Sequence, residues 1–336
     1  DSTGLVSITK KYHKKDIKCF TIYSDDKKYD EFKNVDKTIK QLKVNHKWVK
    51  INKTKTFANL KKIIRHRKYP ILTVTSYIQW LMFESISKDR IKVIISGNGS
   101  DEIFSGYYDH HLAYINDINN NKKLREISIK NWRNNIEPLI RNPLMKDYKN
   151  YKKNQNHLKI IKGENHSSKF GLKKIDIKFK EKKFSKYFLK NRMINEMFYE
   201  SVPVILQEED NNAMYFSMEN RSPYLNSDLY KFIINSPVSL FVRNGYAKTI
   251  LRDSLKKISP KHVLTNYEKV GFNISPSKLL NFRSKNILNF VKKKSLIYSI
   301  INKKKILDIL NNKEMIDKNS NFLFKFLNAK ILMDMS

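Results

Sequence analysis

Apolar and polar positions alternate in two different periods along the first third of the chain. Short runs that are apolar or that alternate predict strands, and stretches with an apolar side chain every three to four residues predict helices. The predicted strands are 17–23, 46–51 and 91–95, and the predicted helices begin at residue 5 and cover 30–42, 57–64 and 71–87. Strands that alternate with helices are typical of βαβ units and a parallel sheet.

The pattern changes after Tyr107, where the strand-like runs end. Residues 119–123 form a polar joint, and residues 149–183 are rich in lysine and asparagine with little periodicity, which predicts a long loop. From Phe184 onward helical spacing dominates, and residues 279–335 predict a further set of amphipathic helices.

Together these patterns predict the fold class. We expect an α/β fold in which a parallel sheet with flanking helices is followed by a mostly helical C-terminal half. We place the first part at 1–118 and the second at 119–336, both within one domain. The length of 336 residues is enough to bury a sizeable core.

Composition excludes a membrane span and a cysteine-based site. The most apolar stretch, 71–86, is interrupted by polar side chains, so it predicts a buried helix. Cys19 is the single cysteine, which excludes an internal disulfide and a cysteine zinc site. We therefore expect a protein of the reducing cytoplasm that does not enter a membrane.

The chain is strongly basic, with 67 lysines and arginines against 32 acidic residues and a formal net charge of +35. Such a charge suits a polyanion-binding surface. The lysines, however, are spread from Lys10 to Lys330 and are not gathered in a stripe with aromatic residues between them. We favour compositional drift as the cause, and we expect no specific nucleic-acid partner.

The stretch with the clearest chemistry is 94–107, which reads Ile-Ile-Ser-Gly-Asn-Gly-Ser-Asp-Glu-Ile-Phe-Ser-Gly-Tyr. It predicts a buried parallel strand that ends at Ser96, a glycine-rich turn, and a helix with acidic residues in its first turn. Glycines at such a turn let backbone N–H groups approach an anion closely, and Asp101 could hold the magnesium that accompanies a polyphosphate. An ordinary tight turn capped by acids is the alternative.

Further blocks follow in order. They read Asp-Asn-Asn-Ala-Met at 210–214, Ser-Met-Glu-Asn-Arg-Ser-Pro-Tyr-Leu-Asn at 217–226, Ala-Lys-Thr-Ile-Leu-Arg at 247–252 and Lys-Val-Gly-Phe at 269–272. With these blocks the chain resembles the asparagine synthetase family, specifically its C-terminal ATP-cleaving synthetase domain, from residue 1 to about residue 280. The resemblance implies a fold of the adenine nucleotide alpha-hydrolase type with a pyrophosphate-binding PP-loop.

The beginning of the chain also resembles this family. Asp1-Ser2-Thr3 looks like the second half of the family's pyrophosphate loop. The resemblance implies that the rest of this loop and a glutaminase domain lie upstream, so we expect residues 1–336 alone to be inactive.

The resemblance implies ATP and Mg²⁺ as cofactors. Such enzymes join ATP to a carboxylate, release pyrophosphate, and let glutamine-derived ammonia displace AMP to leave an amide. By resemblance the magnesium ligands are Asp1 and Asp101, and Lys248 lies against the phosphates and acts in catalysis. The other nucleotide-binding residues implied are Ser2, Ser24, Ser96, Gly97, Gly99 and Lys269, with Ser24 beside adenine and Lys269 in a loop that closes over the nucleotide.

The acceptor side of the cleft is implied to lie at Asp210, Glu219 and Arg221. A buried arginine there could bind a carboxylate with two hydrogen bonds, while a salt bridge that holds a helix end is the alternative, and both stay open. The pair His110-His111 has no cysteine or carboxylate at ligand spacing, which predicts surface or packing histidines.

Three positions depart from the family's pattern. Asn98 stands where the family has an acidic residue, and an amide cannot act as a base although it can hydrogen-bond. Ser105-Gly106 replaces Gly-Gly, and Asn226 replaces Asp. We count Lys248, Asn98, Glu219 and Arg221 as the catalytic candidates.

These departures leave the acceptor open between aspartate and a sugar acid, and they leave two alternatives to the amide-forming enzyme. The first is a tRNA-modifying PP-loop ligase, which the net charge of +35 favours. The second is a non-catalytic synthetase-like scaffold, which Asn98 favours. The oligomeric state is open as well.

Overall fold

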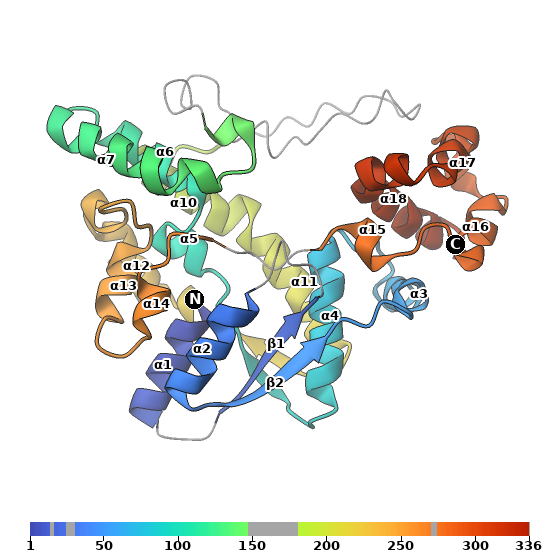
Figure 1. Cartoon of the computed structure of the whole chain (residues 1–336), viewed down its shortest axis with the longest axis horizontal. Helices are drawn as coiled ribbons and strands as arrows, with labels where there is room; N and C mark the ends of the chain where they lie inside the picture. Colours follow the sequence, from blue (N-terminus) through green and yellow to red (C-terminus); the bar gives the residue numbers. More distant parts are fainter. Residues whose placement is uncertain (14–16, 25–30, 147–180, 270–273, 336) are drawn as a thin grey trace.

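The computed structural model describes residues 1–13, 17–24, 31–146, 181–269 and 274–335. Helices dominate, and short parallel strands lie near the N-terminal end of the chain (Figure 1). The elements of the first third are α1 (Ser2–His13), β1 (Lys18–Tyr23), α2 (Phe32–Leu42), β2 (Asn45–Lys50), α3 (Thr56–Arg67), α4 (Val74–Ser87), β3 (Val93–Ile95) and α5 (Ser100–Phe104). Each strand predicted in this part is confirmed.

The remaining elements are almost all helical, as predicted. The helices are α6 (Tyr108–Asp117), α7 (Lys122–Asn135), α10 (Phe188–Asn195), the π-helix η5 (Glu196–Glu200), α11 (Val202–Met214), α12 (Ser227–Asn235), α13 (Thr249–Ser254), α14 (Lys261–Leu264), α15 (Pro276–Leu279), α16 (Lys285–Lys292), α17 (Lys303–Asn311) and α18 (Lys313–Met333). Short 3₁₀ turns lie at Glu137–Leu139, Pro143–Met145, Pro223–Leu225, Val238–Leu240 and Leu296–Ser299. The predicted loop at 149–183 lies largely outside the described residues.

The strands form two parallel pairs. β1 pairs with β2 over six residues, and β3 pairs with the short strand β4 (Glu219–Arg221). β4 was not predicted, because three polar residues carry no strand pattern of their own. Backbone hydrogen bonds to the chain around β3 define it, from Glu219 N to Lys92 O (2.8 Å) and from Ser96 N to Arg221 O (2.9 Å).

The prediction that the strand before Ser96 is buried is wrong. Val93 is 43% and Ile95 58% exposed, and only Ile94 between them packs inward. Side chains alternate between the two faces of a strand, and β3 has one face against the helices and one face open. Ile94 contacts an apolar cluster on the covered face, whose buried members are Phe83, Ile86, Ala213 and Met218.

Two helices connect the strand pairs. α4 and α11 pack on each other, and they supply most of the cluster that contacts Ile94 of β3. Phe20 of β1 packs against the same cluster, so both pairs are covered from one side by these helices. The loop that follows β3 is thereby placed beside α11.

The largest apolar core joins the two ends of the chain. Side chains of β1, β2, α3 and α4 are buried against the helices α15 to α18, which lie beside α3 and α4 in Figure 1. Leu60, Ile63 and Ile64 of α3 and Phe324 of α18 are buried in this core. The division at residue 118 stays a prediction, and this core takes residues from both parts.

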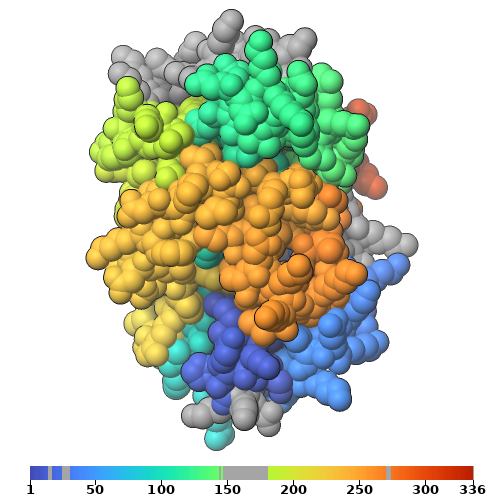
Figure 2. Space-filling model, turned by 90° about the vertical axis from the view of Figure 1, so that its left-hand side faces the viewer, coloured from blue at the N-terminus to red at the C-terminus, as the bar shows by residue number. Residues whose placement is uncertain are grey.

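A second core holds the middle of the chain. It lies among α5, α6, α7, α10, α12 and α13, and Trp132, Leu189 and Phe241 are fully or almost fully buried in it. Figure 2 shows the segment around α12 to α14 between the helices α6 and α7 and the N-terminal α1. This arrangement brings α5 and α13 toward the start of α1.

Local sequence explains where the helices begin and end. The helix predicted to begin at residue 71 begins at Val74, because the Thr73 side chain accepts a hydrogen bond from Ser76 N (3.2 Å) as its N-cap. α3 extends beyond the predicted 57–64 and ends at Arg67, where the C-cap residue Lys68 is left-handed with φ 61°. Among the described residues, no helix has both the length and the apolar character needed to cross a membrane.

Candidate active site

Four charged side chains meet from four separate segments of the chain. Asp1 precedes α1, Asp101 lies in α5, Lys248 caps α13, and Lys269 follows α14. Lys248 Nζ lies 2.7 Å from Asp101 Oδ1 and also contacts the carboxylate of Asp1, and Lys269 Nζ lies 2.5 Å from Asp101 Oδ2. We call these four residues the lysine–aspartate cluster. Sequence analysis named all four of them.

Two glycines allow the cluster to form. A Cβ atom on Gly97 would lie 3.0 Å from Asp1 Cβ and 3.0 Å from Ser2 N, so the loop after β3 touches the start of the chain through backbone atoms. A Cβ atom on Gly106 would lie 2.0 Å from Asp101 Oδ1 and 2.3 Å from Lys248 Cε. Any side chain at Gly106 would therefore displace the ion pair.

The first of these loops is further tied to the start of the chain. Ser100 Oγ donates a hydrogen bond to Asp1 Oδ1 (2.8 Å), and Tyr224 Oη donates to the backbone oxygen of Asp1 (3.1 Å). Gly99 has φ 81°, and a Cβ atom there would lie 2.1 Å from Leu225 Cδ2. Gly99 therefore serves the turn and its packing, and its predicted contact with the nucleotide stays a prediction.

Arg252 orients the segment that carries Lys269. Its guanidinium donates to the carbonyl oxygens of Ala247 (2.8 Å), Leu264 (2.7 Å) and Asn266 (2.9 Å), and thereby ties α13 to the chain beyond α14. Arg252 lies within the matching block 247–252, but no role was predicted for it. Lys248 itself has φ 57°, an uncommon conformation for a residue other than glycine, which aims its side chain at Asp101.

Neighbouring charges and burial have opposite effects on the pKa values in the lysine–aspartate cluster. Burial would raise the pKa of Asp101, but Lys248 and Lys269 outweigh it and hold that pKa well below its usual range. Burial lowers the pKa of both Lys248 and Lys269, and the Asp101 carboxylate counteracts it. Lys269 Nζ also lies 3.9 Å from the centre of the Tyr107 ring, whose hydroxyl donates to Glu102 Oε1 (2.5 Å).

Glu219 and Arg221 lie on β4, apart from the lysine–aspartate cluster. The expectation of a buried arginine is wrong: the side chains of Arg221 and Glu219 are 61% and 60% exposed and form an ion pair of 2.7 Å. Alternate residues of a strand share a face, so these two point outward while Asn220 points inward. Asp210 is exposed on α11, whereas its neighbours Glu208 and Glu209 are buried.

Comparison with known proteins places the chain. The family model for asparagine synthase matches residues 1–326. The chain belongs to the asparagine synthase family. It is also similar to the asparagine synthetase [glutamine-hydrolyzing] 1 of Bacillus subtilis (strain 168), with 23% identity over 310 residues that cover 82% of this chain and 45% of that protein. The chain thus spans about half the length of this relative.

The asparagine synthase family uses ATP, and Mg²⁺ is typical of it. The two carboxylates of the cluster fit a divalent cation, because Asp1 and Asp101 both contact the same ammonium group of Lys248. A site that places one positive charge between two carboxylates has the hard oxygen ligands that magnesium prefers. Ser2 N lies beside Gly97 and Ser24 follows β1 in the other strand pair, and their roles stay predictions.

An acid that was not predicted for the site, Glu209, lies beside Asn98, the position where this member departs from its family. The Asn98 Nδ2 group donates to Glu209 Oε2, to which Ser96 Oγ also donates (3.4 Å), and Gln79 Nε2 donates to Glu209 Oε1 (2.8 Å). Burial raises the pKa of Glu209 to about 7, although these hydrogen bonds act to lower it. Glu209 stands next to Asp210 in a matching block, but no spacing rule showed that it faces Asn98.

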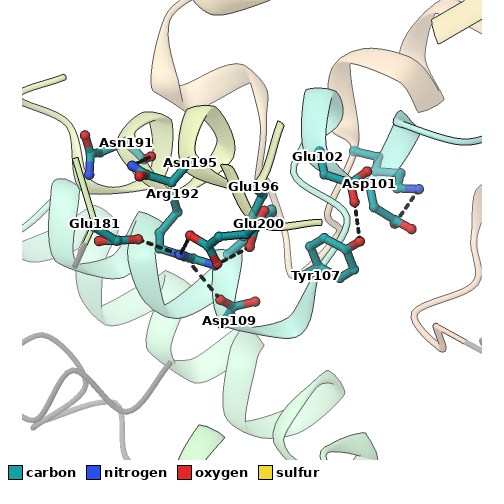
Figure 3. A network of polar contacts seen from close by, with 12 residues as sticks. Asp101, Glu102, Tyr107, Asp109, Glu181, Asn191, Arg192, Asn195, Glu196 and Glu200 are labelled. Carbon is teal, nitrogen blue, oxygen red and sulfur yellow. Dashed lines mark hydrogen bonds and ion pairs between the residues drawn. The ribbon is translucent and has the colours of Figure 1, made fainter. Parts of the chain in front are cut away.

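A second group of charges lies to the left of Asp101 and Glu102 in Figure 3. Arg192 contacts Glu181 (2.5 Å), Glu196 (2.5 Å), Glu200 (2.8 Å) and, at 3.8 Å, Asp109. We call these five residues the arginine–glutamate cluster. Burial would lower the pKa of Arg192, but the surrounding carboxylates raise it above its usual value.

His110 and His111 lie beside the arginine–glutamate cluster. His110 and His111 are buried, which confirms packing and not surface histidines. The expectation that no carboxylate is near is wrong, because His110 Nε2 lies 2.8 Å from Glu196 Oε2 across 86 positions of sequence. Asp109, His110 and Glu196 could together ligate a metal, but the guanidinium of Arg192 already contacts both of these carboxylates.

Proposed function

We propose that this chain is the synthetase part of an enzyme that forms an amide at the expense of ATP. The lysine–aspartate cluster carries the proposal, because it gathers two magnesium-type carboxylates and two lysines around a glycine-rich turn. Pyrophosphate is a polyanionic leaving group, and such a group needs backbone donors and cations where its charge develops. Membership of the asparagine synthase family supports the same reaction class.

The proposed reaction has two halves. First, an oxygen of the acceptor carboxylate attacks the α-phosphorus of ATP, and pyrophosphate leaves, which gives an acyl-adenylate. Magnesium bound at Asp1 and Asp101 would neutralise phosphate charge. Lys248 and Lys269 bind phosphate oxygens and hold the charge of the leaving group, while Ser2, Ser96 and Gly97 surround it with donors. In the second half ammonia displaces AMP.

The acceptor is proposed to bind beside β4. There Arg221 offers an exposed guanidinium, which can exchange its contact with Glu219 for an acceptor carboxylate. Aspartate or a sugar acid would fit this charge. We further propose that the ammonia comes from glutamine, through a glutaminase domain encoded in the same natural protein.

The products of ATP cleavage test the proposal. The protein expressed from its natural gene is incubated with ATP, magnesium, ammonium chloride and each of a panel of carboxylates that begins with L-aspartate. We expect AMP and pyrophosphate in equal amounts with one of these acceptors. ADP and inorganic phosphate as the products would contradict the proposal.

A non-catalytic scaffold is the second candidate, and Asn98 favours it because an amide stands at the position of the family's acid. A scaffold would cleave no ATP with any acceptor. It would also bind its partners equally well without Lys248, whereas the proposed enzyme depends on that side chain.

A further inference from the structure

The acid missing at position 98 has a counterpart on another element. We propose that Glu209, reached through the hydroxyl groups of Ser96 and Ser222, accepts the proton that the attacking amine loses during amide formation. This inference rests on the proposed function, and it assigns the proton-accepting role to α11 instead of to the loop after β3.

Hydrogen bonds lead from Ser222, the residue after β4, to Glu209. The hydroxyls of Ser222 and Ser96 lie 3.1 Å apart, and Ser96 Oγ lies 3.4 Å from Glu209 Oε2. Ser222 directly follows Arg221, and both serines are partly exposed, whereas Glu209 is 3% exposed. A hydroxyl group both donates and accepts, so these two serines can pass a proton from the partly exposed Ser222 to the buried carboxylate.

The surroundings of Glu209 suit a base that changes its protonation state. Its hydrogen-bonding neighbours come from α4, from the loop after β3 and from β4, and all of them are neutral: Gln79, Ser96, Asn98 and Asn220. The charged neighbours in sequence on α11 and β4 have other partners, since Glu208 pairs with Arg67 (2.9 Å) and Arg221 pairs with Glu219. Among the residues that the structure describes, the neighbours that lower the pKa of Glu209 most are neutral hydrogen-bond donors, and burial raises that pKa to about 7.

Asn98 and Glu209 form a complementary pair. If position 98 carried the family's acid, two carboxylates would be in contact here, which is unfavourable unless they share a proton. The amide of Asn98 donates to the carboxylate instead and holds it in place. The exchange of an acid for an amide in the loop is thus matched by an acid on the helix.

The proposed step is balanced. The lone pair of ammonia forms the C–N bond to the acyl carbon, and the bond from that carbon to the phosphate oxygen breaks, with its electron pair leaving on AMP. The nitrogen loses one proton to the Ser222 hydroxyl, which passes a proton to Ser96, and Ser96 passes one to Glu209 Oε2. Both serines are neutral again after the transfer.

Two assays separate the halves of the reaction. Pyrophosphate exchange into ATP reports the adenylate half, and amide formation with ammonium chloride reports the whole. Both are measured on the protein from its natural gene, with the carboxylate that supports the fastest exchange. For Glu209→Gln, which keeps size and hydrogen bonding, we expect exchange within about threefold of the unsubstituted protein and amide formation reduced at least about 100-fold. Glu126→Gln, on the exposed face of α7, is the matched control.

A reciprocal exchange tests the pairing itself. The double variant Asn98→Asp with Glu209→Gln keeps one acid and one amide in contact but places the acid in the loop. We expect it to recover at least about tenfold of the amide formation lost in Glu209→Gln. We also compare the rates of amide formation in the unsubstituted protein and in Glu209→Gln at each pH. The ratio of the first rate to the second should rise with pH through about 7, because only the deprotonated carboxylate accepts a proton.

The outcomes are distinguishable. Absence of exchange with every carboxylate in the unsubstituted protein overturns the proposed function. Normal exchange together with unchanged amide formation in Glu209→Gln overturns only the role of Glu209. Equal loss of exchange and amide formation in that variant also overturns it, because the carboxylate would then merely support the loop.

Discussion

The two charged clusters described above differ in composition and exposure. The lysine–aspartate cluster has two cations and two acids from four distant segments, and its Asp1 and Lys269 side chains are 32% and 29% exposed. The arginine–glutamate cluster has one cation among four acids, and Arg192 is 4% exposed. A solute can reach the first cluster, whereas the second is enclosed by α6, α10 and η5 (Figure 3).

This difference indicates what each cluster does. Lysines present flexible point charges, so under the proposed function Lys248 and Lys269 would leave Asp101 for phosphate oxygens when a metal takes their place. The guanidinium of Arg192 has planar donors that contact several carboxylates at once, which suits a fixed structural centre. The partly exposed cluster is therefore assigned to turnover and the enclosed one to stability, and substitutions can test this assignment.

Substitution of Lys248 should have the largest effect. Lys248→Ala removes the cation that both carboxylates share, and we expect ATP cleavage to fall at least about 10⁴-fold, which corresponds to more than about 5 kcal/mol. The urea midpoint should change less than in the Arg192→Met variant, because Lys269 still contacts Asp101 and the Asp1 side chain is 32% exposed. The control is Lys256→Ala on the exposed surface beyond α13, which should leave ATP cleavage unchanged. Equal rates in both variants would point to the non-catalytic scaffold.

Substitution of Arg192 should affect stability instead. Arg192→Met leaves four carboxylates without their cation, and removing one partner of a buried ion pair typically costs about 3 to 5 kcal/mol. Urea unfolding should show this loss, while the ATP cleavage rate per folded molecule should remain. Arg65→Met, at an exposed position of α3, should change the free energy of unfolding by less than about 0.5 kcal/mol. A fully stable Arg192→Met variant with lost turnover would reverse the assignment of the two clusters.

A single methyl group at Gly106 should disturb only the lysine–aspartate cluster. Gly106→Ala places a Cβ atom within 2.0 Å of Asp101 Oδ1 and 2.3 Å of Lys248 Cε, so both side chains must move. We expect a decrease in ATP cleavage of about 100-fold, or about 2.7 kcal/mol, with an increased magnesium requirement. A magnesium titration of the initial rate measures both, and an unchanged titration curve would contradict this geometry.

The smallest effect concerns acid stability. The pKa of Asp101 is lower in the folded protein than its unfolded value of about 3.9, so its stabilising contribution is present above about pH 4 and is lost as the pH falls below that value. Urea unfolding should show that the free energy of unfolding falls from pH 5 to pH 3. This decrease should be about 1 kcal/mol smaller in Asp101→Asn than in the unsubstituted protein. An identical loss in both proteins would show that Lys248 and Lys269 do not stabilise the carboxylate.

Local patterns in the sequence were sufficient for part of this picture. The strands β1, β2 and β3 and the helices between them follow from periodicity, and the lysine–aspartate cluster follows from motifs whose glycines have a direct steric role. What could not be predicted depends on contacts between distant segments. β4 exists because β3 pairs with it, Glu209 faces Asn98 across 111 positions, and Arg192 meets Asp109 only in the folded chain.

The burial of individual strand residues could not be predicted from the sequence either. The run from Ile91 to Ile95 is apolar, yet Val93 and Ile95 are exposed, because burial depends on which neighbours cover each face of a strand. The same limit applies to Arg221, whose block matched the family while its exposure depended on the register of β4.

The core that joins the ends of the chain has a consequence for the synthesis of the protein. β1, β2, α3 and α4 leave the ribosome before α15 to α18, but their apolar side chains are covered by these helices, which follow more than 180 residues later. Closing so long a loop is slow, and the early segments expose apolar surface until then. Ribosome-bound chains that end before α15 should therefore recruit chaperones, and release of the last helices should end that dependence.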